Sequence, residues 1–213
     1  MAIHLSKRLK TIYEMVPYGK IADVGADHGK LVISLSLDKK INYGIAIENK
    51  IGPFNRLKNA IDNSHVDNVK ALFSNGIEDI DEDVDTVIIA GMGGLSIIDI
   101  LKNSPSKIKN ISNIIIDAHN AVSDVRKEIT KMGFLIEDEK IVFESNKYYE
   151  IIKFSKTDKI ITYEEADFVF GPILRKQKDI LYLNKWNEII KKMKQLLEKN
   201  TLSDDKISRS EER

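Results

Sequence analysis

Apolar runs of strand length alternate with amphipathic segments of helix length from residue 20 to residue 131. This alternation constrains the fold more than any other feature, because strands joined by helices form βαβ units with a parallel sheet and helices on both faces. We therefore predict an α/β fold. The strand-length runs are KIADVG, NYGIAIE, VKALFS, DTVIIAG and NIIIDA, and the helix-length segments are KLVISLSL, FNRLKNAIDN, LSIIDILKN and SDVRKEITKM.

The pattern continues at both ends of this unit. Apolar residues at helical spacing over residues 5–15, before Pro17 and Gly19, predict a helix that leads into the first strand. After Gly133, the runs FLIEDEKIVFES and KYYEIIKF have no helix-length segment between them, so we expect an antiparallel hairpin at the sheet edge. The prediction is a seven-stranded, mostly parallel sheet in one domain, residues 1–157.

The last part of the chain has a helical pattern. Residues 163–200 are interrupted by Gly171 and Pro172, which favours an antiparallel helical hairpin, or short coiled coil, as a second domain over residues 158–200. Residues 201–213 are almost wholly polar, and we expect a frayed tail there. The apolar seam that would join the two helices consists of Trp186, Ile189, Met193 and Leu196.

Composition excludes several kinds of site. The chain has no cysteine, which excludes a disulfide framework, a thiolate zinc site and a cysteine nucleophile, and we predict no metal site. The 33 basic residues balance 33 acidic ones, so nucleic-acid binding would need a local patch. No apolar run approaches the roughly 20 residues of a membrane span, and the N-terminus has no signal-peptide pattern. We expect a soluble, cytoplasmic protein, and its oligomeric state stays open.

The first strand ends in the loop Asp23-Val24-Gly25-Ala26-Asp27-His28-Gly29, at the edge where an open α/β sheet binds its ligand. Asp27 occupies the place of the middle glycine in the dinucleotide motif G-x-G-x-x-G, where its charge would repel a phosphate. A cationic or zwitterionic ligand fits better. The alternative is a simple strand-to-helix turn with Asp27 as the helix cap.

Three further signals lie at the ends of later strands. Glu48 ends the second strand about 20 residues past the glycine loop, where a carboxylate can accept hydrogen bonds from a ribose diol. Asn75 and Gly76 follow the third strand and could read an adenine ring or form only a turn. The fourth strand ends in Ala90-Gly91-Met92-Gly93-Gly94, which exposes backbone at the ligand edge.

The motifs DVGADHGKL, ENKIGPF, SNG, IIAGMGG and KYYEI, in this order, resemble the bacterial tRNA adenine-N1 methyltransferases that modify position 22 of tRNA. The resemblance covers nearly the whole chain, from LSKRL to FGPIL. It implies a class I, Rossmann-like methyltransferase that uses S-adenosylmethionine and acts on tRNA. One departure is the segment Asp117-Ala118-His119-Asn120, where the family has a Gln-Pro-Asn pattern.

The resemblance also implies the site residues. The predicted cofactor-binding residues are Arg8, Asp23, Gly25, Asp27, His28, Glu48, Asn49, Asn75, Gly76, Ala90, Gly91 and Gly94. The predicted catalytic residues are Asp27, Met92 and Gly93, with Asp27 accepting a hydrogen bond from the adenine amine as positive charge develops.

The substrate would need an extruded base and a basic surface. We predict His28 and Tyr149 as stacking partners for the adenine, although a loop histidine and a sheet-edge tyrosine are the plainer interpretations. Lys191, Lys192 and Lys194 lie in a segment with a local basic excess and would contact the tRNA backbone, unless they only form a solvated helix face. The competing functions are a nicotinamide-dependent oxidoreductase, a non-catalytic RNA-binding protein, and a methyltransferase for a small molecule or protein.

Overall fold

A computed structural model describes the backbone of residues 3–211 and the side chains of residues 3–198. The strands are β1 (Lys20–Val24), β2 (Tyr43–Glu48), β3 (Val69–Phe73), β4 (Thr86–Met92), β5 (Asn113–Ala118), β6 (Phe134–Glu144) and β7 (Lys147–Lys156). The helices are α1 (Lys7–Met15), α2 (Lys30–Leu37), α3 (Ile51–Ser64), α4 (Gly94–Lys102), α5 (Pro105–Ile108), α6 (Val122–Lys131), α7 (Glu165–Phe170), α8 (Leu174–Gln177) and α9 (Ile180–Glu211).

All the strands belong to one sheet in the order β3-β2-β1-β4-β5-β7-β6, which confirms the predicted seven-stranded arrangement. Neighbouring strands among β1 to β5 pair in parallel, and β7 is antiparallel to both β5 and β6. Ser145 and Asn146 form the loop of the β6–β7 hairpin with φ of 50° and 60°. Two consecutive positive φ angles match the twist of an antiparallel pair, so this short loop closes the sheet edge.

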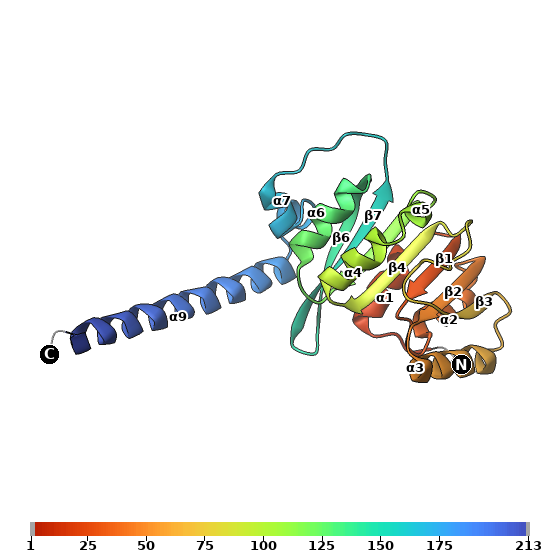
Figure 1. Ribbon diagram of the computed structural model, residues 1–213, viewed down its shortest axis with the longest axis horizontal. Helices are drawn as coiled ribbons and strands as arrows, with labels where there is room; N and C mark the ends of the chain where they lie inside the picture. Colours follow the sequence, from red (N-terminus) through yellow and green to blue (C-terminus); the bar gives the residue numbers. More distant parts are fainter. Residues whose placement is uncertain (1–2, 212–213) are drawn as a thin grey trace.

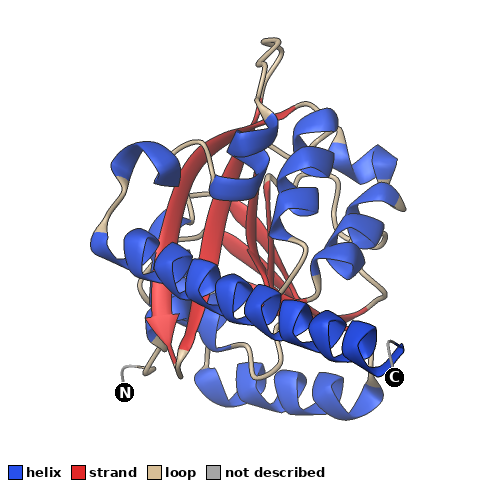
Figure 2. Cartoon of the chain, turned by 90° about the vertical axis from the view of Figure 1, so that its left-hand side faces the viewer, coloured by secondary structure: helices blue, strands red, loops and turns tan. Residues whose placement is uncertain are grey.

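Side chains that alternate along the strands form two core layers, one on each face of the sheet, and Figure 2 shows helices on both sides of the sheet. In β1, Ala22 and Val24 belong to the layer that contains residues of α4 and α6, whereas Ile21 belongs to the layer formed with α1, α2 and α3. Helices therefore cover both faces, as the predicted βαβ pattern requires. Asp23 lies two residues after Ile21 in β1, so its side chain points to the same face of the sheet. It is buried at the end of the layer under α1 to α3.

The C-terminal part differs from the predicted hairpin. Gly171, with φ of 79°, and Lys178, with φ of 48°, interrupt the segment and leave only the short helices α7 and α8 before α9 begins. In the described part of the chain, α9 is a single long helix that runs outward from the body beside β6 (Figure 1). Its backbone continues to Glu211, through most of the predicted frayed tail, while residues 212–213 lie outside the described residues.

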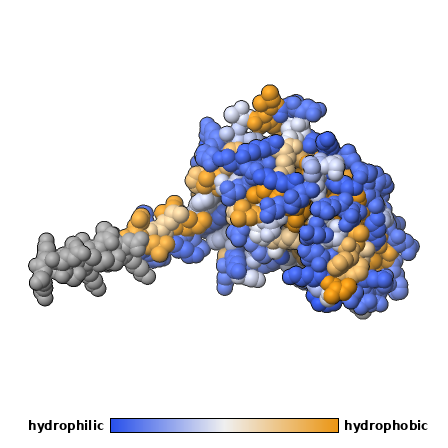
Figure 3. All heavy atoms as spheres, in the orientation of Figure 1, coloured by the Kyte–Doolittle hydropathy of each residue, from blue (hydrophilic) through white to orange (hydrophobic). Residues whose placement is uncertain are grey.

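The predicted apolar seam is therefore not covered by a second helix among the described residues. Trp186 contacts the Phe170 ring, with 4.6 Å between ring centroids, but Met193 and Leu196 are 59% and 61% exposed. Figure 3 shows apolar residues at the surface of α9 where it leaves the body.

A buried charge network joins the start of α9 to the sheet. Arg126 of α6 is fully buried, and its Nε donates to Glu139 of β6 (2.8 Å) while its other nitrogens donate to Glu150 of β7 and to the Phe168 carbonyl (3.0 Å). Lys185 of α9 donates to the same Glu150. Burial alone would raise the pKa of Glu150, but the charges of Arg126 and Lys185 outweigh it and the pKa is lowered.

Removal of the central cation should destabilise the fold strongly. Arg126→Met leaves the Glu139 carboxylate buried without a cation and Glu150 with Lys185 alone, so we expect the free energy of unfolding to fall by about 3–5 kcal/mol in chemical denaturation. Lys131→Met removes an exposed ion pair with Glu128 on the same helix and should cost less than about 1 kcal/mol. Similar losses in the two variants would contradict the stabilising role of the buried network.

Candidate active site

The loop after β1 has the conformation that its glycines allow. Gly25 and Gly29 have φ of 73° and 65°, in the left-handed region that favours glycine. The amides of Gly25 and Ala26 donate to the Ile47 carbonyl (2.9 and 3.2 Å), which ties the loop to β2. A Cβ atom on Gly25 would collide with Met92 Cε of β4. The first glycine of the motif is therefore favoured by its positive φ, whereas the Met92 methyl group could move away from a Cβ atom.

Glu48 connects this loop with the end of β2. Its Oε1 accepts a hydrogen bond from the amide of Asp27 (2.8 Å), which has φ of 48°. Glu48 also lines the cavity described next, so one carboxylate orients the loop and faces the ligand space. The sequence analysis predicted Glu48 as a cavity residue but not this hydrogen bond, because the backbone conformation of Asp27 depends on tertiary structure.

A cavity of about 510 Å³ lies at the carboxyl ends of β1 to β4 and against α4. Asn49 and Asn75 meet across it, with Asn49 Nδ2 donating to Asn75 Oδ1 (3.1 Å). Several predicted residues line this cavity, namely Gly25, Glu48, Asn49, Asn75, Gly76, Met92 and Gly93. Further lining residues were not predicted from the sequence, and half of them lie on α4 or just after it; the set is Ile47, Lys50, Ser74, Glu78, Ser96, Asp99, Ile100 and Asn103. The signal that could have found them is the position of α4 directly after the glycine-rich loop.

Asp23 is almost fully buried at the end of β1. Burial, and to a smaller extent the negative charge of Glu48, raises the pKa of Asp23 to about 7. A carboxyl with this pKa ionises near neutral pH, and a cationic ligand beside it would favour the charged form. Asp23 is not among the residues that line the cavity.

The side chains of Asp27 and His28 lie on the outer side of the loop. Asp27 Oδ1 is 3.8 Å from Arg56 Nη2 of α3, and the Asp27 side chain is 63% exposed. His28 Nε2 is 3.7 Å from Asp27 Oδ2. Neither residue lines the cavity, so the structure does not bring these two predicted residues together with Met92 and Gly93.

Arg8 and Tyr149 meet at the ends of β4 and β5. Arg8 Nη1 donates to Asp117 Oδ2 (2.8 Å) and to His119 Nε2 (3.2 Å), and the Arg8 guanidinium lies 5.0 Å from the centre of the Tyr149 ring. Burial raises the pKa of Asp117, although Arg8 and His119 oppose this effect. The segment that departs from the family pattern therefore supplies two members of this cluster, for which the sequence analysis assigned no role.

The loop of residues 90–94 is fixed by close contacts with the segment after β5. Gly94 N donates to Asn120 Oδ1 (2.9 Å), and a Cβ atom on Gly94 would lie 2.5 Å from the Asn120 carbonyl oxygen. His119 N donates to the Met92 carbonyl (2.8 Å). Ala90 is partly buried at the end of β4, where the register with β5 shifts between Ala90 and Met92. The contact with the Asn120 carbonyl explains Gly94 by packing.

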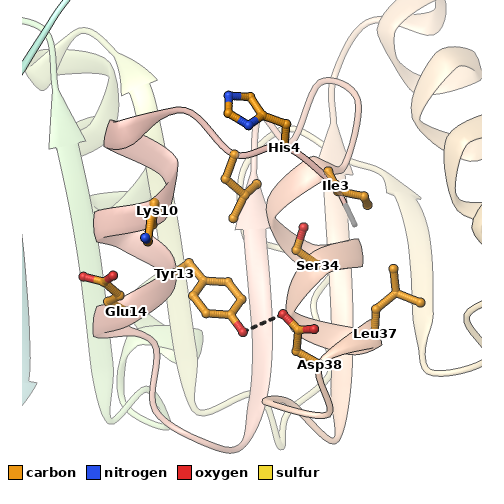
Figure 4. A pocket seen from close by; sticks show the side chains of 9 residues that line it. Ile3, His4, Lys10, Tyr13, Glu14, Ser34, Leu37 and Asp38 are labelled. Carbon is orange, nitrogen blue, oxygen red and sulfur yellow. Dashed lines mark hydrogen bonds between the residues drawn. The ribbon is translucent and has the colours of Figure 1, made fainter. Parts of the chain in front are cut away.

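A second hollow of about 650 Å³ lies between the N-terminal segment, α1 and α2 (Figure 4). Tyr13 of α1 donates to Asp38 (2.8 Å) across it, as the dashed line in the figure marks. None of the predicted site residues lines this hollow, so we do not assign it to the active site.

The predicted tRNA-binding lysines are separate from the cavity. Lys191, Lys192 and Lys194 are exposed on α9, which projects away from the sheet (Figure 1). Among the described residues, no group of three or more His, Asp or Glu side chains is placed to hold a metal ion. Within the same residues, no helix has the length and apolarity needed to cross a membrane.

The sheet order, with a cavity at the carboxyl ends of the strands, defines a class I methyltransferase fold. Residues 5–152 match the family model described as a methyltransferase domain. The chain is 31% identical over 193 residues to the tRNA (adenine(22)-N(1))-methyltransferase of Bacillus subtilis, covering 87% of this chain and 81% of that protein. The chain therefore belongs to the family of tRNA (adenine(22)-N(1))-methyltransferases.

Solved structures agree with this assignment. A putative tRNA (m1A22) methyltransferase of Streptococcus pneumoniae, Sp1610, in complex with S-adenosyl-L-methionine, has a TM-score of 0.86 and 30% identity, covering 96% of this chain and 97% of that chain. TrmK of M. capricolum, in complex with S-adenosyl-homocysteine, has a TM-score of 0.82 and 28% identity, covering 91% and 87%.

Replacement of Asp23 should change the pH dependence of stability. Because the pKa of Asp23 is higher in the fold than in the unfolded chain, ionisation destabilises the fold as the pH rises from about 4 to 7, and the cost is complete above pH 7. Asp23→Asn removes a cost of at most about 4 kcal/mol at pH 8 and less at pH 5. Chemical denaturation at pH 5 and at pH 8 should show that the variant has a higher free energy of unfolding than the wild type, by an amount that grows with pH. Asp62→Asn, at an exposed carboxylate of α3, is the control, and an equal gain there would contradict this role of burial.

Proposed function

We propose that this chain transfers the methyl group of S-adenosylmethionine to N1 of the adenine at position 22 of tRNA. The observation that carries the proposal is the cavity at the ends of β1 to β4, where Glu48 and the glycine-rich loops meet. The chain that forms this cavity belongs to the family of tRNA (adenine(22)-N(1))-methyltransferases. Residues 1–157 would form the cofactor-binding methyltransferase domain. The following residues 158–200 would form the part that contacts RNA, and the cytoplasm, where tRNA is modified, would be the location.

The residues around the cavity fit the cofactor. A volume of about 510 Å³ lies within the range of roughly 300–1,000 Å³ that small-molecule sites occupy. Glu48 can accept hydrogen bonds from ribose hydroxyls, and Asn75 with the backbone at Gly76 can contact the adenine ring. The absence of a side chain at Gly93, which lines the cavity, allows a ligand to approach the backbone there closely. Asp23 places a carboxyl near the loop, which suits the cationic end of the cofactor.

The chemistry requires positioning more than proton transfer. The cofactor, when bound, supplies an electrophilic methyl group, and N1 of adenine has a free lone pair, so no base has to activate it. The residues of the chain must then hold the adenine in line with that group, an effect of at most about 7–11 kcal/mol. Met92 and Gly93 at the end of β4 would flank the reacting atoms. The hydrogen bond from the adenine amine to Asp27 stays a prediction, because its carboxylate faces Arg56.

A direct assay tests this function. The protein is incubated with radiolabelled S-adenosylmethionine and unmodified tRNA, and the nucleosides of the digest are separated. We expect labelled 1-methyladenosine from tRNA with A22 and none from a matched transcript with G22. Binding of the cofactor without transfer to any tRNA would contradict the substrate and would direct the search to other RNAs, proteins or small molecules. Absence of cofactor binding would contradict the methyltransferase activity itself.

Charge reversal on α9 should weaken tRNA binding. Lys191→Glu, Lys192→Glu and Lys194→Glu together remove three positive charges from an exposed helix face, so the affinity for tRNA and the slope of its salt dependence should both fall. The matched control reverses Lys39, Lys58 and Lys109, which are exposed on the body of the protein and give the same change in net charge. Equal affinities of the two triple variants in filter binding would remove α9 from the tRNA interface.

A further inference from the structure

A compact polar and aromatic cluster lies at the ends of β4 and β5, outside the cofactor cavity. It consists of Arg8, Asp117, His119 and Tyr149, from α1, β5, the loop after β5, and β7. None of these residues lines the cavity of about 510 Å³. The proposed reaction uses the cavity for the cofactor and, apart from the predicted stacking role of Tyr149, leaves this cluster without a role.

The cluster and the cavity meet at the end of β4, where neighbouring residues contact each of them. Met92 lines the cavity and lies so near Gly25 that a Cβ atom there would meet its Cε. A Cβ atom on the preceding residue, Gly91, would instead lie 3.5 Å from Arg8 Nη1 and 3.8 Å from His119 Nε2. A base stacked on the cluster would therefore lie beside the cavity, at the strand end that the two share.

The ion pair in this cluster is incompletely satisfied. Within the described residues, Arg8 Nε and Asp117 Oδ1 are buried without a hydrogen-bond partner. Such atoms cost free energy, and a native structure that keeps them needs a reason beyond stability. The reason suggested by the contacts is orientation, because Arg8 uses one nitrogen for both Asp117 and His119.

His119 is the member of the cluster that is open to a ligand. The residue is exposed, and its ring lies 5.9 Å from that of Tyr149 at an interplanar angle of 61°. Because a guanidinium only donates hydrogen bonds, His119 Nε2 is the acceptor, which fixes the orientation of the ring. An exposed aromatic ring with a fixed orientation is a suitable surface for stacking a base.

We propose that the ring of His119 is the stacking surface for the extruded adenine, and that Arg8 and Asp117 are positioning residues for this ring. The inference rests on the proposed function, because it names the residue that receives the target base. It replaces His28 in that role, since His28 lies on the outer side of the loop after β1, 3.7 Å from Asp27.

The charges of the cluster suit the product. Methylation at N1 leaves a cationic base, which an uncompensated arginine nearby would disfavour. The carboxylate of Asp117, 2.8 Å from Arg8, balances the guanidinium. The paired charges allow Arg8 to orient His119 without opposing the positive charge that develops on the adenine.

The test uses two substitutions at His119, which is exposed and can be changed without loss of a buried charge. His119→Ala removes the ring, and His119→Phe restores a stacking face without ring nitrogens. Stacking contributes about 1–3 kcal/mol per base, which corresponds to a loss of about 5- to 150-fold in kcat/KM for tRNA in His119→Ala. His119→Phe should recover most of this loss, and the affinity for S-adenosylmethionine should stay unchanged in both. Tyr18→Ala, at an exposed aromatic before β1, is the control and should keep full activity.

A fluorescence measurement separates this inference from the proposed function. With 2-aminopurine at position 22 of tRNA, saturation with the wild-type protein should raise the fluorescence as the base leaves its stack. His119→Ala should give a smaller rise and His119→Phe a rise close to that of the wild type. If the wild type forms no 1-methyladenosine, the proposed function fails, yet the fluorescence still decides whether His119 holds the base. Equal signals and equal kcat/KM values for wild type and His119→Ala would overturn the inference.

The positioning role of Arg8 has its own readout. Arg8→Lys keeps the charge opposite Asp117 but loses the planar geometry that serves two acceptors, so kcat/KM should fall while the cofactor affinity is kept. In a His119→Phe background the acceptor is absent, and Arg8→Lys should cause no further loss. Losses that multiply in the double variant would show that Arg8 acts independently of His119 and would overturn its role as a positioning residue.

Discussion

Pairing of β1 with β2 on one side and β4 on the other is the constraint on which the candidate site depends. Register pairs Asp23 with Ala46 of β2 and Ile88 of β4, so the three strands end at the same sheet edge. The loop after β1 is then held by the Ile47 carbonyl and by Glu48, while the loop after β4 presses Met92 against Gly25. The ligand cavity is the space that these turns leave at one edge, as the topology of a parallel sheet requires.

The antiparallel strand β7 supplies part of the cluster beside the cavity. It lies beside β5 and brings Tyr149 next to Arg8 of α1, so residues more than a hundred positions apart meet around Gly91. The network around Arg126 lies on the other face of this hairpin, because Glu150 directly follows Tyr149 in β7, and it joins β6 and β7 to α7 and to the beginning of α9. One hairpin thus supports two functions, a base-binding cluster at its strand ends and the attachment of the helix that we propose for tRNA contact.

Much of the fold could be predicted from the sequence because its signals are local. The alternation of apolar runs and amphipathic segments specifies βαβ units, and the lack of a helix between residues 134 and 156 specifies the hairpin. The C-terminal hairpin was predicted from an apolar seam, which indicates only that a helix has an apolar stripe. Positive φ at Gly171 and Lys178 shortened the segment before α9, and no local pattern specified the buried contact of Arg126 with Glu139 that holds this region.

The sequence by itself determined which glycines and carboxylates stand at the ends of strands, and hence the edge of the sheet where the cavity lies, because strand ends and turn residues are properties of neighbours along the chain. Only the tertiary structure decided where the side chains point. It turned Asp27 towards Arg56 and His28 towards Asp27, and it joined Asp117 and His119 to Arg8. These side-chain orientations depend on backbone dihedral angles and on contacts between residues far apart in the chain. The spacing of residue types along the sequence specifies neither.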